Sequence, residues 1–331
     1  MLSIVSSVVC IAVMSQDIGS AAASSVEPNQ PEHLRPVTEG DDGWLFLASE
    51  IRFVQAGSFW GEHAAPVSRA RKPEWADPEP VILDFAQQLQ DAGIRLLVVP
   101  VPAKATVMKE HLKQPDTVPV HSNLQAFLER LRSADVEVLD LQPHLQAVSD
   151  SGQQGYLKTD THWSPVGLQR AADLISGWLI DQGVAAPNNV APAMVEKEVQ
   201  LRGDLVQMRD GGDGPSTEVT TVMIPELAWG PVSRDSPVVL LGDSHALVYS
   251  TGDDMHATDA GLAEHISAQL GHGVDRVAVR GSGATATRIE LLRRRDQLKG
   301  KKAVVWVFAA RDLTESDGWR QVPVISAKPK S

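Results

Sequence analysis

From Pro80 onward the chain alternates segments with helical spacing and short apolar runs, and this alternation constrains the fold more than any other feature. Apolar residues at 82, 85, 86 and 89 share one helical face, and residues 95–100 form an apolar run short enough for a buried strand. Residues 124–131 and 136–141 repeat this pattern of a helical segment followed by a strand. Alternating helices and buried strands are typical of an α/β protein with a mostly parallel sheet.

The second half continues the pattern after one irregular stretch. Ser164 and Pro165 are typical of the N-cap and first residue of a helix. Residues 186–236 are less regular and hold one β-rich piece, so we expect a small insertion or cap there. The further expected elements are strands at 238–241, 274–279 and 303–308 and helices at 260–270 and 285–298. We therefore expect one domain over residues 26–320 and a short, frayed C-terminal tail at 321–331.

Charge excludes one class of partner. The 331 residues carry a net charge of −12, and nucleic-acid binding draws on clustered lysine and arginine instead. The one basic cluster, Arg293-Arg-Arg295 with three nearby lysines, falls at the end of an expected helix, where it complements the helix dipole. We expect no nucleic-acid partner.

The N-terminus has the pattern of an export signal. The apolar run from Leu2 to Met14 is shorter than the roughly 20 residues that span a bilayer, and Ala21-Ala-Ala23 follows it. No lysine or arginine precedes Arg35, so an uncleaved anchor and a cytoplasmic protein remain alternatives. Residues 1–25 are therefore predicted to be a signal peptide or membrane anchor, and the domain is expected in the periplasm. The only cysteine, Cys10, lies in this run, which leaves the domain without a disulfide.

A candidate nucleophile follows the strand at 238–241. Ser244 ends the run Val-Val-Leu-Leu-Gly-Asp-Ser, and ligands of open α/β sheets bind beyond the carboxyl ends of strands. Gly242 permits a tight turn, and a following helix would aim free N–H groups at an oxyanion. A bare Gly-Asp-Ser triplet is also a common helix cap, so the serine needs a base to carry the assignment.

His162 is the best candidate base among the ten histidines, because Asp160 lies two residues before it. Residues i and i+2 of an extended segment face the same side, so the carboxylate can fix the imidazole tautomer. The alternatives are a solvent-exposed loop histidine and a metal ligand. A zinc site would need at least one further ligand, and His111, His121 and His144 show no ligand-like spacing, so we predict no metal. His245 is a rival base, although adjacent residues on a turn point apart.

These residues resemble the blocks of the SGNH or GDSL hydrolases. Residues 241–244, Leu-Gly-Asp-Ser, resemble the serine block, and residues 280–285, Arg-Gly-Ser-Gly-Ala-Thr, the glycine block. Residues 305–313 occupy the place of the block that supplies an asparagine, and residues 160–165, Asp-Thr-His-Trp-Ser-Pro, resemble the Asp/His block. Two features depart from the usual pattern of these hydrolases. The Asp/His block precedes the serine instead of following it, and its spacing is D-x-H instead of D-x-x-H.

Both departures are features of the alginate O-acetyltransferase branch, the AlgX and AlgJ type. The chain also resembles that branch near its start, in Gly40-Asp-Asp-Gly-Trp-Leu-Phe46 with Glu50, in Gly57-Ser-Phe-Trp-Gly61 and in Val99-Pro-Val-Pro-Ala-Lys104. The resemblance implies a three-layer α/β/α, circularly permuted SGNH-like fold.

The resemblance also implies a substrate site around the serine. Backbone N–H groups of Ser244 and of Gly281 or Gly283 would bind the oxyanion, and Arg311 stands where other members place asparagine. A guanidinium there is suited to an oxyanion or a uronate carboxylate, with a structural ion pair as the alternative. Tyr156 and Trp163 flank the Asp/His block and are candidates for stacking on a sugar, with packing into the core as the alternative for Trp163.

The function implied is transfer of an acetyl group through acyl-Ser244 onto an exported polysaccharide, alginate-like or another exopolysaccharide. An MBOAT-type membrane protein would supply the acetyl group, with other polymer-export components as partners and no cofactor. The alternatives are a carbohydrate acetylesterase with the same triad and a non-catalytic polysaccharide-binding component of an export complex.

Overall fold

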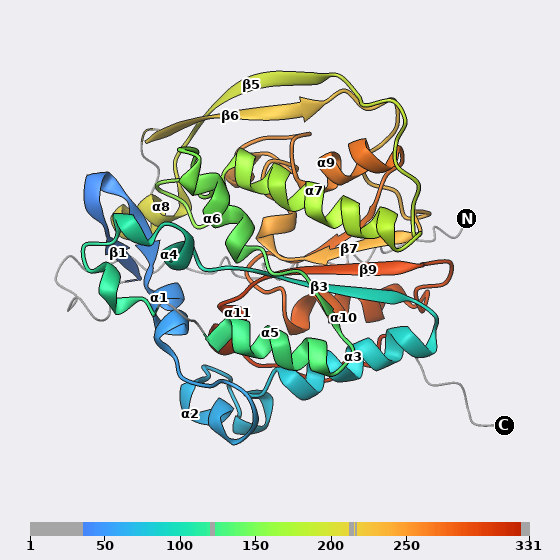
Figure 1. The fold of residues 1–331 in the computed structure, drawn as a ribbon, viewed down its shortest axis with the longest axis horizontal. Helices are drawn as coiled ribbons and strands as arrows, with labels where there is room; N and C mark the ends of the chain where they lie inside the picture. Colours follow the sequence, from blue (N-terminus) through green and yellow to red (C-terminus); the bar gives the residue numbers. More distant parts are fainter. Residues whose placement is uncertain (1–35, 120–122, 212–214, 216, 326–331) are drawn as a thin grey trace, which may run out of the picture.

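The computed structural model describes residues 36–119, 123–211, 215 and 217–325, and a five-stranded sheet lies at its centre (Figure 1). The strand order is β4-β3-β9-β7-β8, and every neighbouring pair is parallel. The bounds are β3 Arg95–Val101, β4 Glu137–Val138, β7 Val238–Gly242, β8 Asp275–Ala278 and β9 Ala303–Ala309. Because β9 lies between β3 and β7, segments from both halves of the chain meet in mid-sheet. The predicted α/β class is confirmed.

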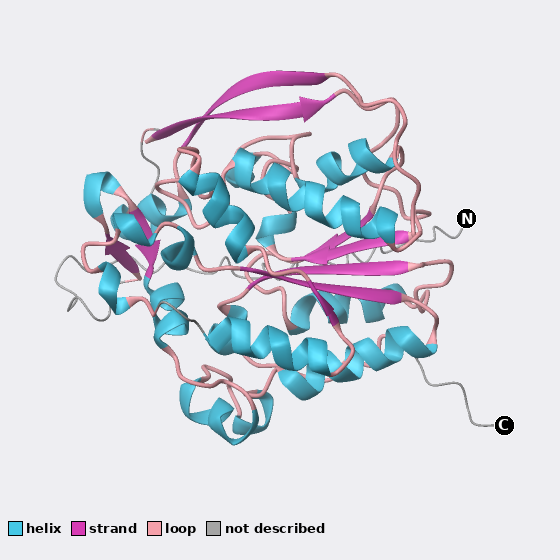
Figure 2. Ribbon diagram, in the orientation of Figure 1, coloured by secondary structure: helices cyan, strands magenta, loops and turns pink. Residues whose placement is uncertain are grey.

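Helices cover both faces of this sheet (Figures 1 and 2). One layer holds α6 Gln142–Asp150, α7 Pro165–Asp181 and α9 Leu262–Leu270, and the other holds α3 Glu79–Asp91, α5 Asn123–Ser133 and α10 Thr285–Arg294. Every residue of β7 and β9 is buried, as expected for strands covered on both sides. The uninterrupted apolar runs of these strands thus match their place in the fold.

Local sequence explains the helices that carry the site. In α3, Ile82, Phe85 and Leu89 lie on the buried face that their spacing predicts. The hydroxyl of Ser164 accepts a hydrogen bond from the N–H of Gly167 at 3.0 Å and caps α7, as expected. This cap fixes the start of α7 immediately after the Asp/His block.

An N-terminal unit packs beside the carboxyl ends of the strands. It contains β1 Val37–Glu39 paired antiparallel with β2 Leu45–Leu47, then α1 Ala48–Gln55, α2 Ala64–Val67 and, after β3, α4 Lys104–Val107. Val37 and Leu45 form a small apolar cluster with Leu205 and Val206 of α8 Asp204–Asp210. The unit is therefore packed against the predicted insertion.

The predicted insertion forms a long antiparallel hairpin. Its strands are β5 Met194–Leu201 and β6 Glu218–Pro225, with α8 between them, and the hairpin arches over α7 and α9 (Figure 1). The β-rich piece expected here is β6, whereas β5 was not expected from the sequence. Most residues of β5 are exposed, so its sequence does not need the apolar residues by which a buried strand is predicted.

Three expectations for other elements are corrected. β4 covers only Glu137–Val138 of the expected 136–141. α10 ends at Arg294, because Arg295 adopts a left-handed conformation with φ 55°. The expected tail is packed at its start, since Val322 and Val324 are both buried.

The predicted signal peptide or anchor, residues 1–25 with Cys10, lies outside the described residues. Within the described ranges, no helix has the length and apolar character needed to span a membrane.

Candidate active site

The carboxyl ends of the central strands carry the segments singled out from the sequence. β7 leads to Ser244, β8 to Gly281 and β9 to Arg311. Because the strands are parallel, these ends meet at one edge of the sheet. The glycine segment touches the serine turn: a Cβ placed on Gly283 would lie 3.4 Å from the Cβ of Asp243.

Asp243 holds the serine turn with both carboxylate oxygens. One accepts the N–H of His245 at 2.8 Å, and the other accepts the N–H of Ala309 at 2.7 Å, which joins β7 to β9. Burial favours a raised pKa, but His245 and these bonds outweigh it and lower the pKa of Asp243 to about 2. Asp243 therefore organises the turn as an anion.

Ser244 is half-buried and begins one turn of 3-10 helix, Ser244–Ala246, instead of the α-helix expected from the sequence. The N–H of His245 is taken by Asp243, so this turn does not present a row of free donors. In the described chain the N–H of Ser244 itself donates no hydrogen bond. It therefore remains the one oxyanion donor that this turn offers.

Asp160 and His162 form the close pair predicted from their spacing. Oδ1 of Asp160 lies 2.6 Å from Nδ1 of His162 and also accepts the His162 N–H at 2.9 Å, so ring and backbone are fixed together. Asp160 is fully buried and His162 nearly so. Burial alone would lower the pKa of His162, but the Asp160 carboxylate outweighs it and raises this pKa to about 9.

The other ring nitrogen of His162 is positioned for chemistry. Nε2 is buried and has no hydrogen-bond partner among the described residues. The imidazole of His245, the residue after Ser244, lies 5.1 Å from that of His162 between ring centroids. The Asp/His block and the serine turn therefore meet, although no hydrogen bond joins His162 to Ser244 in the part of the chain described. The Ser244–His162 contact stays a prediction.

His245, the rival base, is held away from solvent. Its Nδ1 lies 3.0 Å from Asp243, its ring meets the indole of Trp163 edge to face at 5.2 Å, and it is 1% exposed. Burial lowers its pKa, which favours the neutral imidazole. Its contacts are those of a structural residue beneath the turn.

Lys104 lies between the N-terminal signature and the loop of the Asp/His block and contacts both. Its buried ammonium donates to the carbonyls of Leu45 at 2.6 Å, Lys158 at 2.9 Å and Asp160 at 3.0 Å. The ammonium also lies 5.1 Å from the centre of the Trp44 ring. Burial lowers the pKa of Lys104 to about 8. The lysine thus joins the N-terminal signature to the loop that carries Asp160.

Arg311 forms the structural ion pair that was the alternative to a substrate role, and its partner is Glu50. Its Nη1 lies 2.8 Å from Oε1 of Glu50, and the N–H of Lys104 donates to the other Glu50 oxygen at 3.1 Å. Glu50 is buried, whereas Arg311 keeps 18% of its side chain exposed. The guanidinium is therefore anchored on one side and open on the other.

Gly281 and Gly283, both proposed as oxyanion donors, differ in whether their backbone N–H is free. The N–H of Gly283 donates to Asp312 at 2.9 Å, and a Cβ there would lie 2.3 Å from the Cβ of Phe308. Gly283 is therefore a close-packing position, and its expected oxyanion role is corrected. Gly281 has φ +77°, is exposed and makes no backbone hydrogen bond within the described residues. It remains a candidate donor.

The expected sugar-stacking role of Tyr156 and Trp163 is also corrected. Both side chains are 0% exposed, so neither offers a face to a sugar. The hydroxyl of Tyr156 donates to the carbonyl of Pro102, and the backbones of the two aromatic residues pair across the loop. They belong to the core that supports the Asp/His block, which was the alternative expectation for Trp163.

Two acidic residues of the insertion, missed in the sequence, also support this block. Asp204 accepts the N–H of Thr161 at 2.7 Å and donates its own N–H to Oδ2 of Asp160 at 2.8 Å. Glu218 accepts the N–H groups of Lys158 and Thr159 at 2.8 and 2.9 Å. They lie at least 43 residues along the chain from the backbone groups that they bind, and no local spacing relates them to the block.

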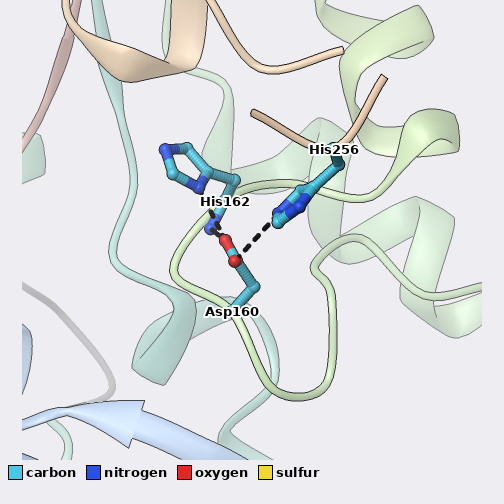
Figure 3. A group of neighbouring side chains, drawn as sticks. All are labelled: Asp160, His162 and His256. Carbon is cyan, nitrogen blue, oxygen red and sulfur yellow. Dashed lines mark hydrogen bonds and ion pairs between the residues drawn. The ribbon is translucent and has the colours of Figure 1, made fainter. Parts of the chain in front are cut away.

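A second imidazole reaches the same carboxylate. Nε2 of His256 lies 3.0 Å from Oδ2 of Asp160, opposite His162 (Figure 3). The three side chains offer ligand atoms within 4.8 Å of one another, the spacing of a metal site. These atoms are already paired as hydrogen-bond partners, so a metal ion would have to displace those bonds.

A cleft of about 810 Å³ opens beside Arg311 and Gly281. Ser244 does not line it. Its cationic lining residues are Arg52, Arg69, Arg71, Lys72, Arg311 and Arg320, and its acidic ones are Asp312, Glu315 and Asp317. Trp75, between Lys72 and Arg320, lies within 5.2 Å of both cations. The cleft is therefore basic with an aromatic wall.

Comparison with known families and relatives gives one consistent result. Residues 37–310 match the family described as SGNH hydrolase-like domain, acetyltransferase AlgX. A probable alginate O-acetylase AlgJ of Pseudomonas aeruginosa is 30% identical over 174 residues, which are 51% of this chain and 40% of that protein. The alginate biosynthesis protein AlgX of Pseudomonas putida is 25% identical over 260 residues, 71% of this chain and 52% of that protein. The matches thus span about half or less of these relatives.

Among solved structures, the O-acetyltransferase domain of Pseudomonas putida AlgJ is similar, with a TM-score of 0.59 and 22% identity. The similarity covers 84% of this chain and 92% of that domain. At this identity it establishes the shared fold.

Proposed function

Because the chain belongs to the AlgX/AlgJ family of SGNH hydrolase-like acetyltransferases, we propose that it moves acetyl groups through acyl-Ser244 onto the hydroxyls of an exported polysaccharide. The observation that carries the proposal is the buried Asp160–His162 pair, whose Nε2 is left without a partner beside the serine turn. A base held by a carboxylate, with its other nitrogen free, is what a serine nucleophile needs.

In the first step, His162 Nε2 takes the hydroxyl proton of Ser244 as the serine oxygen bonds to the acetyl carbon of an ester donor. The developing negative charge lies on the former carbonyl oxygen, for which the N–H groups of Ser244 and Gly281 are the available donors. The ester bond then breaks, and the leaving alkoxide takes the proton from His162. Asp160 stabilises the imidazolium in between.

In the second step, a sugar hydroxyl replaces the leaving alcohol. His162 removes its proton as the sugar oxygen bonds to the acetyl carbon, and Ser244 leaves with that proton. Water in the same position would give hydrolysis, so the acceptor decides between a transferase and an acetylesterase.

The basic cleft supports an anionic acceptor. Of its six cations, Arg52 and Arg71 pair with lining acids at 2.7 and 2.6 Å. Among the described residues, Arg69 and Arg320 make no ion pair, so their charges are free for a carboxylate-bearing polymer such as a polyuronate. Arg311 also lines this cleft and keeps 18% of its side chain exposed, so it can contact an incoming sugar.

We propose that the acetyl donor is supplied by an MBOAT-type membrane protein and that transfer takes place in the periplasm, within a polymer-export assembly. The predicted export signal and the family support this setting.

The test is covalent labelling of the purified chain with 4-nitrophenyl acetate, followed by mass spectrometry. We expect one added acetyl group on Ser244 and none there in Ser244→Ala. Ser133→Ala, an exposed serine at the end of α5, is the matched control and should label as the wild type does.

Adding oligosaccharides then identifies the acceptor. Transfer from acyl-Ser244 to oligouronates that exceeds hydrolysis supports a transferase, whereas release of acetate alone would make the protein an esterase. Labelling that persists unchanged in Ser244→Ala would contradict the proposal. If Ser244→Ala left polymer acetylation intact while deletion of the protein abolished it, a binding role would replace catalysis.

A further inference from the structure

The carboxylate of Asp160 is shared by two imidazoles that come from opposite sides (Figure 3). Oδ1 faces Nδ1 of His162 at 2.6 Å, and Oδ2 faces Nε2 of His256 at 3.0 Å. Asp160 is 0% exposed, and the His256 side chain keeps only 5%. A triad needs only the first of these contacts, so the second calls for its own explanation.

The backbone of His256 is strained. Its φ and ψ are 72° and −45°, and the N–H of Ala257 donates to the carbonyl of Met255 at 2.9 Å. These are the features of a classic γ-turn, a rare conformation for a residue with a side chain. Strain of this kind persists where the surrounding structure enforces it, and it concentrates at functional sites.

The loop that carries His256 is attached to both halves of the proposed triad. It follows the turn of Ser244, and the N–H of Tyr249 closes it by donating to the carbonyl of Met255 at 2.8 Å. The hydroxyl of Tyr249 donates to the carbonyl of Trp163, next to His162, at 3.1 Å. The γ-turn therefore lies in a segment that cannot relax without moving the serine turn or the Asp/His block.

The contacts around Asp160 show what the second imidazole does there. Oδ1 accepts from the backbone and ring of His162, and Oδ2 accepts from the N–H of Asp204 at 2.8 Å and from His256. Without His256, Oδ2 would keep only the backbone bond from Asp204, so the carboxylate would lose one of the two contacts that hold Oδ2 while Oδ1 faces His162. A buried anion that loses a donor also becomes costly to keep ionised.

We propose that His256 is a positioning residue for acyl transfer: its Nε2–H holds Asp160 Oδ2, so that Oδ1 remains aligned with Nδ1 of His162. The inference rests on the proposed role of Ser244. It assigns His256 no contact with substrate, and its effect passes through Asp160 to the orientation of the base.

The test compares three substitutions. His256→Leu keeps the volume and removes the donor, whereas His256→Gln places an amide N–H where Nε2 stood. His256→Gly removes the side chain but favours the positive φ, so it covers the case in which the leucine variant does not fold. His265→Gln is the matched control, because His265 is another histidine with a buried side chain and has no contact to Asp160 among the described residues.

Rates of acetyl release from 4-nitrophenyl acetate and Ser244 labelling are measured for each folded variant. We expect kcat to fall by about 10²-fold in the leucine and glycine variants, the order of effect of a misplaced catalytic group, with KM unchanged. The glutamine variant should recover most of this loss, and the His265 control should behave as the wild type.

The outcomes separate the two proposals. A wild-type kcat in His256→Leu or His256→Gly, with Ser244 still labelled, would overturn the positioning role alone. Equal losses in the glutamine and leucine variants would show that the packing of the ring matters and its donor does not, which also overturns it. A wild-type protein that does not label Ser244 would instead overturn the proposed acyl transfer.

Discussion

The two halves of the candidate site are built in different ways. The serine half lies on strand ends: β7 delivers Ser244, and Asp243 fixes the turn through neighbours in the sheet. The base half is a loop, and its position depends on distant groups, namely Lys104, Asp204, Glu218 and His256. The nucleophile is thus placed by the sheet, and the base by long-range polar contacts with buried groups.

This difference predicts that the base half tolerates change least well, and Asp160→Asn is the strongest test. The amide keeps the shape but favours the wrong tautomer of His162 and cannot stabilise its cation. By analogy with serine proteases, kcat should fall about 10⁴-fold. The measurement is steady-state turnover of 4-nitrophenyl acetate, with Asp173→Asn on α7 as the control. A loss of less than about tenfold would mean that Asp160 does not orient or stabilise the base.

The same difference explains how far the sequence could be used. The strands of the central sheet, most of the helices that cover it and the position of Ser244 follow from apolar runs and caps, because these signals are local and burial of the sheet imposes them. The Asp160–His162 pair is also local, with a spacing of two. The sequence does not show whether the backbone N–H of a glycine is free or donates a hydrogen bond. The different roles of Gly281 and Gly283 could therefore not be predicted.

The supports of the base half have no local signal at all. His256 is 96 residues from Asp160, and its γ-turn depends on contacts that only the folded chain makes. The burial of Tyr156 and Trp163 could likewise not be predicted, because it depends on which face of their loop packs against the core. Lys104 was singled out only through a family resemblance, and its three carbonyl partners appear only in the structure.

Lys104→Met tests how much the base half depends on one of these contacts. The substitution removes the ammonium from the buried carbonyls of Leu45 and Asp160, whereas the carbonyl of Lys158 still accepts the N–H of Leu45 at 3.0 Å. Each unsatisfied buried group costs about 1–3 kcal/mol. We expect the free energy of unfolding to fall by about 3 kcal/mol or more in urea titrations. Lys113→Met, an exposed lysine, should change it little. Equal stabilities would show that the ammonium does not hold the loop.

The pH dependence of the reaction sharpens the comparison at His162. The pKa of this residue is raised to about 9, and only the neutral imidazole accepts the serine proton. Below that pH, kcat/KM should rise about tenfold per pH unit and then level off above it. In Asp160→Asn the carboxylate that raises the pKa is gone, so the residual activity should level off at a lower pH. Profiles are measured with 4-nitrophenyl acetate after subtraction of Ser244→Ala, and identical midpoints in both proteins would contradict the assignment.

The smallest expected effect lies outside both halves, in the basic cleft. Arg69 and Arg320 line it without an ion pair among the described residues, so Arg69→Ala and Arg320→Ala should weaken an oligouronate acceptor without changing labelling of Ser244. Each exposed charge contributes about 0.2–1 kcal/mol, so KM for the acceptor should rise by less than about tenfold. The rise should shrink at high salt, because screening weakens exposed charges. Arg132→Ala, an exposed arginine of α5, is the control. A neutral oligosaccharide that is acetylated as well as an oligouronate, with no response to either variant, would show that the cleft does not select the acceptor by charge.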